Sequence, residues 1–232
     1  MVSRERGFTL VELSLAIAFL SILLLAILTI TIQSGKLYAK GLIYKSVNQV
    51  SREVVDILRR DFISSDGIAI VVPPQQGTGD KLTGRVCTGQ VSYAWNTAAL
   101  LNDLSSTQPK ITINGNPAVF ARVPDPGKAL CSQISPGVYP MNITLPGSTE
   151  LLSTDGRTLA VYRASVTKII DDGTRRGLFN ISLEIGTNEE GTSVYDASTN
   201  QYTCRPPTDN TANFEYCTVV GFDTIVRAGG SL

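Results

Sequence analysis

A single carboxylate stands inside the longest apolar stretch of this 232-residue chain. The stretch runs from Phe8 to Ile32, and Glu12 is its only charged residue. A carboxylate in a membrane-spanning helix costs about 2.5–3.5 kcal/mol near the bilayer centre and less near an end, so such a residue usually has a function. Cutting the chain after Gly7 would free the α-amino group of Phe8, a positive charge about one helical turn from Glu12. A neighbouring helix shifted along its axis would bring the two charges face to face. The residues therefore predict a processed helix that packs beside similar helices.

The length of the apolar stretch favours a membrane span over a secretory signal. Its 25 residues would extend roughly 37 Å as a helix, whereas the apolar region of a signal peptide has about 7–15 residues. An uncut single-span anchor fits the length equally well, but it explains neither Glu12 nor the glycine directly before the stretch. Basic residues flank both ends, so the positive-inside rule alone does not fix the orientation.

Residues Arg4 to Glu12, with the apolar stretch behind them, resemble the class III leader and N-terminus of type IV pilins and type II secretion pseudopilins. The resemblance implies a leader peptide over residues 1–7, which a prepilin peptidase removes between Gly7 and Phe8 before methylating the Phe8 amine. It implies that Glu12 pairs with the Phe8 amine of an adjacent pilin subunit during assembly. It also implies a single pass through the cytoplasmic membrane, with an extracytoplasmic C-terminal head that joins a cell-surface filament.

A second helical pattern follows the apolar stretch. From residue 43 to 63, apolar side chains recur in steps of three and four, and charged residues occupy the opposite face. The stripe consists of Ile43, Val47, Val50, Val54, Ile57, Leu58 and Phe62. We therefore predict one long helix over residues 8–64, with a transmembrane half (8–32) and an amphipathic half (43–63).

Residues 65–232 have the texture of a β-rich head, in which short apolar or alternating runs are separated by Gly, Pro, Asn and Asp. The expected strands are 67–72, 91–95, 110–113, 118–123, 141–145, 158–170, 177–185 and 217–227, with a short helix over 97–104. The clearest hairpin joins 158–170 to 177–185, where Phe179, Ile181, Leu183 and Ile185 share one face. An amphipathic helix needs an apolar surface, which an antiparallel sheet provides. The predicted fold class is α+β, with the long N-terminal helix packed on an antiparallel sheet.

Four cysteines, Cys87, Cys131, Cys204 and Cys217, all fall in the expected head. An even number in a translocated domain predicts two disulfides, for which three connectivities exist. We favour Cys204–Cys217, which closes a short loop, together with Cys87–Cys131. Zinc binding is the rival interpretation, but the chain has no CxxC spacing and no histidine.

Residue types that support catalysis are scarce. The absence of histidine removes the commonest general base, and there is no P-loop, dinucleotide-binding or metalloprotease motif. We expect no enzyme and no cofactor. A Ca²⁺ site is a second metal hypothesis, because Glu189, Glu190, Asp196 and Asp209 lie in polar loops. The head carries twelve basic and fifteen acidic residues without a basic cluster interleaved with aromatics, so nucleic-acid binding is not indicated.

The expected function is that of a structural subunit, resembling a minor pilin, in a type IV pilus or related filament. One alternative is a pseudopilin of a type II-like secretion system. Another is a tip adhesin or DNA-uptake receptor, in which Tyr93, Trp95 and Tyr195 would form a contact patch rather than sheet core. A membrane-anchored hydrolase is the enzymatic alternative, and an uncut anchor would be its signature.

Overall fold

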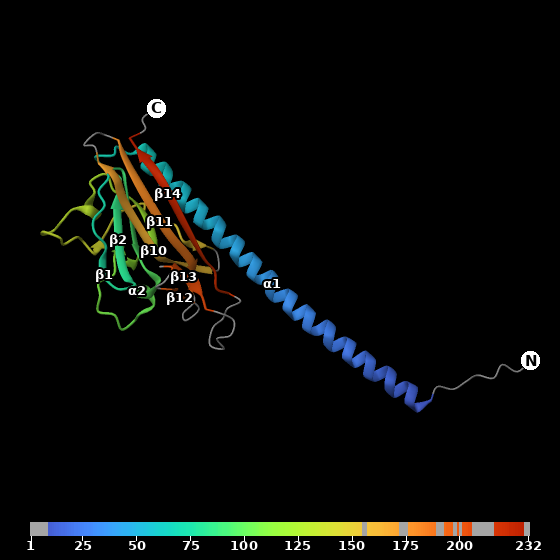
Figure 1. The fold of residues 1–232 in the computed structure, drawn as a ribbon. Coiled ribbons are helices and arrows are strands. Elements are labelled where there is room, and N and C mark those ends of the chain that lie inside the picture. The colour runs from blue at the N-terminus through green and yellow to red at the C-terminus, as the bar shows by residue number, and fades with distance from the viewer. Residues whose placement is uncertain are drawn as a thin grey trace, which may run out of the picture. The chain divides into compact units, whose positions relative to one another are not determined.

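The structure is a computed structural model, which describes residues 9–154, 157–171, 176–188, 193–196, 199, 201–205 and 216–229. The chain divides into two compact units, one up to Leu42 and one from Ile43 onward. Helix α1 (Leu10–Ser64, 55 residues) runs through the boundary between them (Figure 1). The expected helix over 8–64 is therefore present as one continuous element within the described residues.

The second half of α1 supplies one side of the head's main core. Its buried residues are Ile43, Val47, Ser51, Val54, Leu58 and Phe62, and Val50 and Ile57 are partly buried against the same core. The steps of three and four therefore identified the docking face correctly. Ser51 is the exception, because a polar residue within the stripe is also fully buried.

The first sheet contains five described strands in the order β1-β2-β3-β6-β8, all antiparallel. Their bounds are β1 Gln76–Thr78, β2 Lys81–Cys87, β3 Val91–Asn96, β6 Phe120–Pro124 and β8 Thr149–Glu150. Every residue of β3 is buried, as expected for a central strand covered on both faces.

The second sheet has the order β14-β11-β10-β9 within the described residues and is also antiparallel. Its strands are β9 Ser153–Thr154, β10 Arg157–Asp171, β11 Gly177–Thr187 and β14 Val219–Ala228. On β11 the predicted face of Phe179, Ile181, Leu183 and Ile185 enters the main core together with the stripe of α1. Phe62 meets Phe179 edge-to-face, with ring centroids 5.5 Å apart. The observed fold is thus α+β, with a long helix packed on antiparallel sheets.

Short elements complete the head. They are α2 Ala98–Asn102, the 3-10 helix η1 Ala129–Cys131, the hairpin of β12 Ser193–Asp196 with β13 Gln201–Cys204, and the small sheet of β4 Thr112–Ile113, β5 Asn116–Pro117 and β7 Asn142–Ile143. In this small sheet β4 and β7 run parallel, whereas β4 and β5 run antiparallel.

In the first part of the head, one strand prediction was wrong and one long strand was missed. Residues 67–72, expected as a strand, do not form one. Residues 67–69 form a turn, in which the backbone carbonyl of Asp66 accepts the N–H of Ala69 at 2.8 Å, and Val71 makes an isolated antiparallel bridge to Cys87. Strand β2 was missed, because Gly84 and Arg85 interrupt its apolar pattern. Tertiary packing explains both residues: Gly84 leaves room for the Trp95 ring of β3, and Arg85 is buried with its hydrogen bonds satisfied.

Candidate functional site

Thr9 and Glu12 form a reciprocal hydrogen-bonded pair at the start of α1. The backbone N–H and the hydroxyl of Thr9 donate to Oε2 of Glu12 at 3.0 and 2.9 Å. The N–H of Glu12 in turn donates to Oγ1 of Thr9 at 3.3 Å. This is a capping box, which satisfies N–H groups that have no partner within the helix. Sequence reasoning singled out Glu12 but missed Thr9, although the T-x-x-E spacing is a recognised signal for this motif.

Both described hydrogen bonds to the Glu12 carboxylate go to Oε2. A carboxylate has about four lone-pair positions on its two oxygens. Within the described residues, Oε1 has no hydrogen bond, so the carboxylate can still accept from a further donor. Gly7 and Phe8, the predicted processing residues, lie outside the described residues, and the structure therefore does not place the Phe8 amine relative to Glu12.

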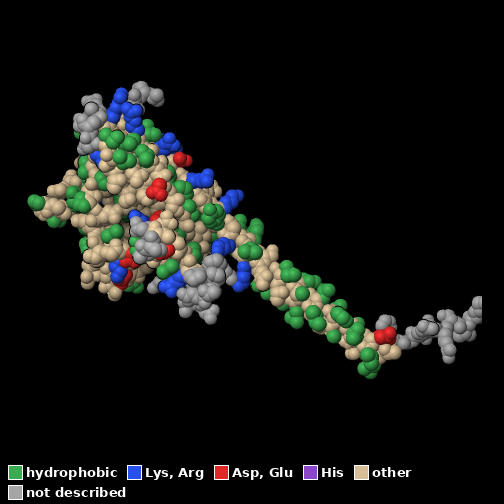
Figure 2. Space-filling view, viewed as in Figure 1, with side chains coloured by type: hydrophobic (Ala, Val, Ile, Leu, Met, Phe, Trp, Pro, Cys, Tyr) green, Lys and Arg blue, Asp and Glu red, His purple; other side chains and the backbone are tan. Residues whose placement is uncertain are grey.

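The helix behind Glu12 exposes its apolar side chains on every side. From Leu10 to Ile32 the large apolar residues are 52 to 84 % exposed within the described structure, and Figure 2 shows hydrophobic side chains along this segment. Soluble proteins rarely leave an apolar surface of this extent uncovered. By length and composition the helix is compatible with a single membrane span.

An ion pair fastens the end of α1 to the first sheet. Arg122 on β6 donates from Nε to Oδ2 of Asp61 at 2.7 Å and from Nη2 to Oδ1 at 3.1 Å. The hydroxyl of Tyr93 on β3 also donates to Oδ2 of Asp61. Burial and this hydrogen bond raise the pKa of Tyr93, and the hydrogen bond to Asp61 raises the pKa of Arg122. Sequence reasoning had placed Asp61 on no particular face, because nothing local indicates a partner sixty residues away.

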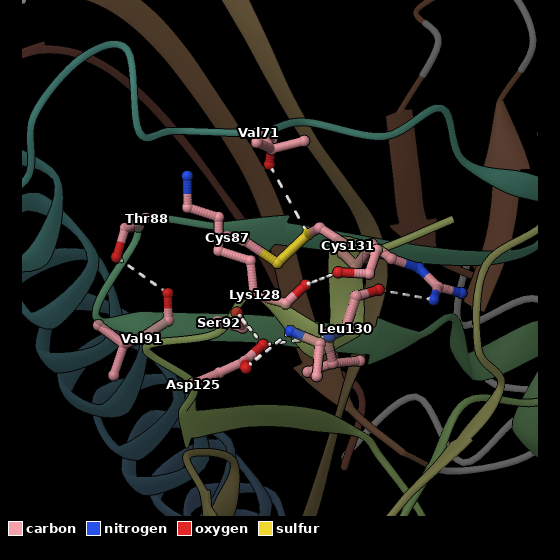
Figure 3. Close-up of a disulfide and its surroundings, with 12 residues drawn as sticks. Val71, Cys87, Thr88, Val91, Ser92, Asp125, Lys128, Leu130 and Cys131 are labelled. Carbon is pink, nitrogen blue, oxygen red and sulfur yellow. Dashed lines mark hydrogen bonds between the residues drawn. A yellow bond between two sulfur atoms is a disulfide. The ribbon is translucent and has the colours of Figure 1, made fainter. Parts of the chain in front are cut away.

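The first disulfide, Cys87–Cys131, joins the end of β2 to η1 (Figure 3). The buried carboxylate of Asp125 lies beside it and accepts from the Ser92 hydroxyl at 2.8 Å. Asp125 also accepts the N–H of Ala129 at 2.8 Å and that of Leu130 at 3.1 Å, which fixes the start of η1. The disulfide and the carboxylate together hold this loop against the first sheet.

The second disulfide, Cys204–Cys217, links the end of β13 to the residues just before β14. The two bonds are the pairs favoured from the sequence, and the chain has no free cysteine. Disulfides form and persist in oxidising compartments, so their presence suits a head outside the cytoplasm.

The other candidate residues divide between core and surface. Tyr93 and Trp95 are 0 and 2 % exposed, so both belong to the core, whereas Tyr195 is 45 % exposed. Of the residues weighed for Ca²⁺, Asp196 is described, and Glu189, Glu190 and Asp209 lie outside the described residues. A search of the described part of the chain found no group of three potential metal ligands.

A buried arginine was not anticipated from the sequence. Arg85 on β2 is 2 % exposed and donates to the carbonyls of Leu130 and Pro140 at 3.0 and 2.5 Å. Burial lowers the pKa of Arg85 to about 10. Its remaining contacts within the described residues are Gln76 Oε1, Met141 Sδ and the ring of Tyr139, none of which carries a negative charge.

Comparisons with protein-family models, with curated proteins and with solved structures gave no match to this chain.

Proposed function

We propose that this chain is a structural subunit of a type IV pilus-like filament, of the minor-pilin kind, which assembles through a processed N-terminal helix. One observation carries the proposal: Glu12 is the lone charge of the apolar stretch from Phe8 to Ile32, and the large apolar side chains from Leu10 to Ile32 are exposed. The residues around it match the pilin leader pattern, and the helix continues into a disulfide-bonded α+β head.

In this proposal a prepilin peptidase cuts between Gly7 and Phe8 and methylates the new amine. Glu12 then pairs with the Phe8 amine of the adjacent subunit. A lone carboxylate is penalised in a low-dielectric setting, and an opposite charge with good geometry offsets much of that penalty. The pairing therefore favours one axial shift between neighbouring helices.

Thr9 has a positioning role in the same step. Because it donates twice to Oε2 of Glu12, it holds the carboxylate at the helix start and leaves Oε1 for the incoming amine. The apolar side chains from Leu10 to Ile32 would hold the subunit in the cytoplasmic membrane before extraction and form the filament core afterwards. The head would stand outside the membrane throughout.

The N-terminus of the protein recovered from its native membrane, or from sheared surface fibres, tests the processing step. The expected product begins at Phe8 and is heavier by about one methyl group in its intact mass. The variant Gly7→Leu should stay uncut, because a bulky side chain would crowd the peptidase site. An intact Met1 in the wild-type protein, or a cut beyond Ile32, would contradict the proposal.

Incorporation into filaments tests the charge pair separately from processing. Glu12→Ala should be cut normally but should be depleted in sheared filaments relative to the membrane fraction. Glu53→Ala is the matched control, because it removes an exposed carboxylate of the same helix. Equal incorporation of the two variants would show that Glu12 does not direct assembly.

A further inference from the structure

The head contains a groove of about 840 Å³ between its two large sheets. Its walls come from strands β2, β3 and β10, from the segment before β1 and from the β12–β13 hairpin. The residues that matter here are Gln75, Arg85, Trp95, Tyr195, Tyr202 and the run Tyr162–Thr167. The volume lies within the range of about 300–1,000 Å³ typical of ligand pockets.

The groove follows the edge of β10. All six consecutive residues from Tyr162 to Thr167 line it. Successive side chains of a strand point to opposite faces of the sheet, so a groove over one face would be lined by alternate residues only. A consecutive run indicates that the groove lies along the strand's edge, where backbone groups are presented.

In the part of the chain that the structure describes, no strand lies beside this edge of β10 over the residues that line the groove. Strand β9 pairs only with Arg157 and Thr158, and Thr97 bridges to Val161. Beyond Val161, no further strand pairs with this edge within the described residues. The first and second sheets therefore separate at Val161, and the groove fills the space between them.

Hydrogen bonding fixes which backbone groups face the groove. The carbonyl of Ala164 accepts from Nε2 of Gln75, which lies outside the second sheet. In an antiparallel strand the N–H and C=O of one residue point to the same edge, so the N–H of Ala164 faces the groove as well. The register with β11 is regular from Arg163 to Lys168, so the backbone of Val166 faces the same way.

An aromatic surface lies at one end of the groove. Tyr195 and Tyr202 are opposite each other on the β12–β13 hairpin. The ring centroids of Tyr195 and Tyr202 are 5.2 Å apart, and those of Tyr202 and Tyr162 are 5.1 Å apart. Aromatic rings of this kind provide a large contact area for apolar side chains of a ligand.

The charged side chains at the groove do not select a charge on the ligand. Arg163 lies opposite Glu184 in the register of β10 with β11. Arg85 is buried, and its guanidinium donates to the carbonyls of Leu130 and Pro140, which do not line the groove.

We propose that the groove binds an extended polypeptide segment of a partner protein, which adds to the edge of β10 as a further strand and places side chains against the tyrosine cluster. Strand addition to an open sheet edge obtains affinity from main-chain hydrogen bonds and specificity from pockets for alternate side chains. The N–H of Ala164 and the N–H and C=O of Val166 provide the main-chain groups, because the carbonyl of Ala164 already accepts from Gln75. The tyrosine cluster provides the side-chain contacts.

A display library of short random peptides, selected against the full chain in detergent micelles, tests the proposal. A synthetic copy of an enriched peptide should lose binding when alternate backbone nitrogens are methylated. Tyr195→Ala should weaken binding roughly tenfold. Tyr216→Ala is the matched control, because Tyr216 is equally exposed and lies outside the groove lining, and its affinity should be unchanged.

Edge pairing is tested directly by Ala164→Pro, which removes an N–H that faces the groove while leaving the ladder to β11 intact. This variant should not bind the peptide. If the variant fails to fold, binding of the backbone-methylated peptides to the wild-type chain tests the edge pairing instead. Failure to enrich any peptide, binding that tolerates methylation at every position, or equal effects of the Tyr195 and Tyr216 variants would overturn the proposal. Binding of an oligosaccharide array, abolished by Tyr195→Ala without any peptide binding, would overturn it in favour of a carbohydrate site.

Discussion

The substitution Asp61→Ala should destabilise the head through the buried partner that it leaves behind. The Tyr93 hydroxyl sits on a side chain that is 0 % exposed and would lose its acceptor, at a cost of about 1–3 kcal/mol. The Arg122 side chain is 33 % exposed and can turn toward water, so loss of its ion pair adds only about 0.2–1 kcal/mol. We expect a total loss of about 1–4 kcal/mol in the free energy of unfolding.

Denaturant unfolding of the full chain in detergent micelles measures this loss, with fluorescence of Trp95 as the signal. Trp95 is the only tryptophan and is buried in the main core of the head. Asp56→Ala, on an exposed position of the same helix, is the control and should change stability by less than about 0.5 kcal/mol.

A double-mutant cycle isolates the cause. Adding Tyr93→Phe to Asp61→Ala removes the orphaned hydroxyl, so the double variant should lose less than the two single variants combined, with a coupling of about 1–2 kcal/mol. If Asp61→Ala and Asp56→Ala lose equal stability, or if the losses of the Tyr93 and Asp61 variants simply add, the buried hydroxyl is not the source of the effect.

Three further predictions concern the head. Burial raises the pKa of the Glu150 carboxyl above its ordinary value of 4.5, although hydrogen bonds from four backbone N–H groups act to lower the pKa. Protonated Glu150 therefore contributes its full stabilisation below about pH 4.5, and this contribution is lost as the pH rises through the raised pKa. In denaturant titrations at a series of pH values across this range, the wild type should lose stability relative to Glu150→Gln as the pH rises. Replacing both cysteines of Cys87–Cys131 with alanine should lower the free energy of unfolding by about 4 kcal/mol, because the disulfide closes a loop with a sequence separation of 44. The same change at Cys204–Cys217, with a separation of 13, should lower it by about 3 kcal/mol. Equal losses in denaturant unfolding would contradict the loop-entropy reasoning. Gly84→Ala would place a Cβ 2.2 Å from the Trp95 ring, so we expect a loss of about 1–3 kcal/mol and altered Trp95 fluorescence, and wild-type fluorescence and stability would contradict this packing.

Helix α1 and the hairpin of β10 and β11 could be predicted because a single periodic pattern extends over many residues. The stripe of α1 repeats from Ile43 to Phe62, and the alternation on β11 repeats from Phe179 to Ile185. Each repeat reflects burial of one face, so local spacing already contains the tertiary information. The fold class followed from these two elements.

The first sheet was harder to predict, because burial there does not follow residue type. Strand β2 has a fully buried Arg85 and a glycine within its buried run. Strand β8 of this sheet has two residues, which is too short for any periodic signal. Conversely, residues 67–72 resemble a strand in composition. They form a turn over 67–69, close to the end of the helix, followed by one isolated bridge from Val71 to Cys87.

The charged residues also differ in whether the sequence alone could identify them. Glu12 could be identified from the sequence because its environment is local: the apolar residues that make it unusual are its immediate neighbours along one helix. Asp61 and Arg122, and Arg85 with the carbonyls of Leu130 and Pro140, are brought together only by the packing of distant segments. Each of these charges looks like an ordinary surface residue in the sequence. The groove along β10 likewise could not be predicted from local sequence. A strand edge is open when no other strand pairs with it, and the residue types of the strand do not indicate whether a partner strand is present. A local charge anomaly therefore supports the proposed assembly function, whereas the proposed peptide site could be found only once the register of the two sheets was known.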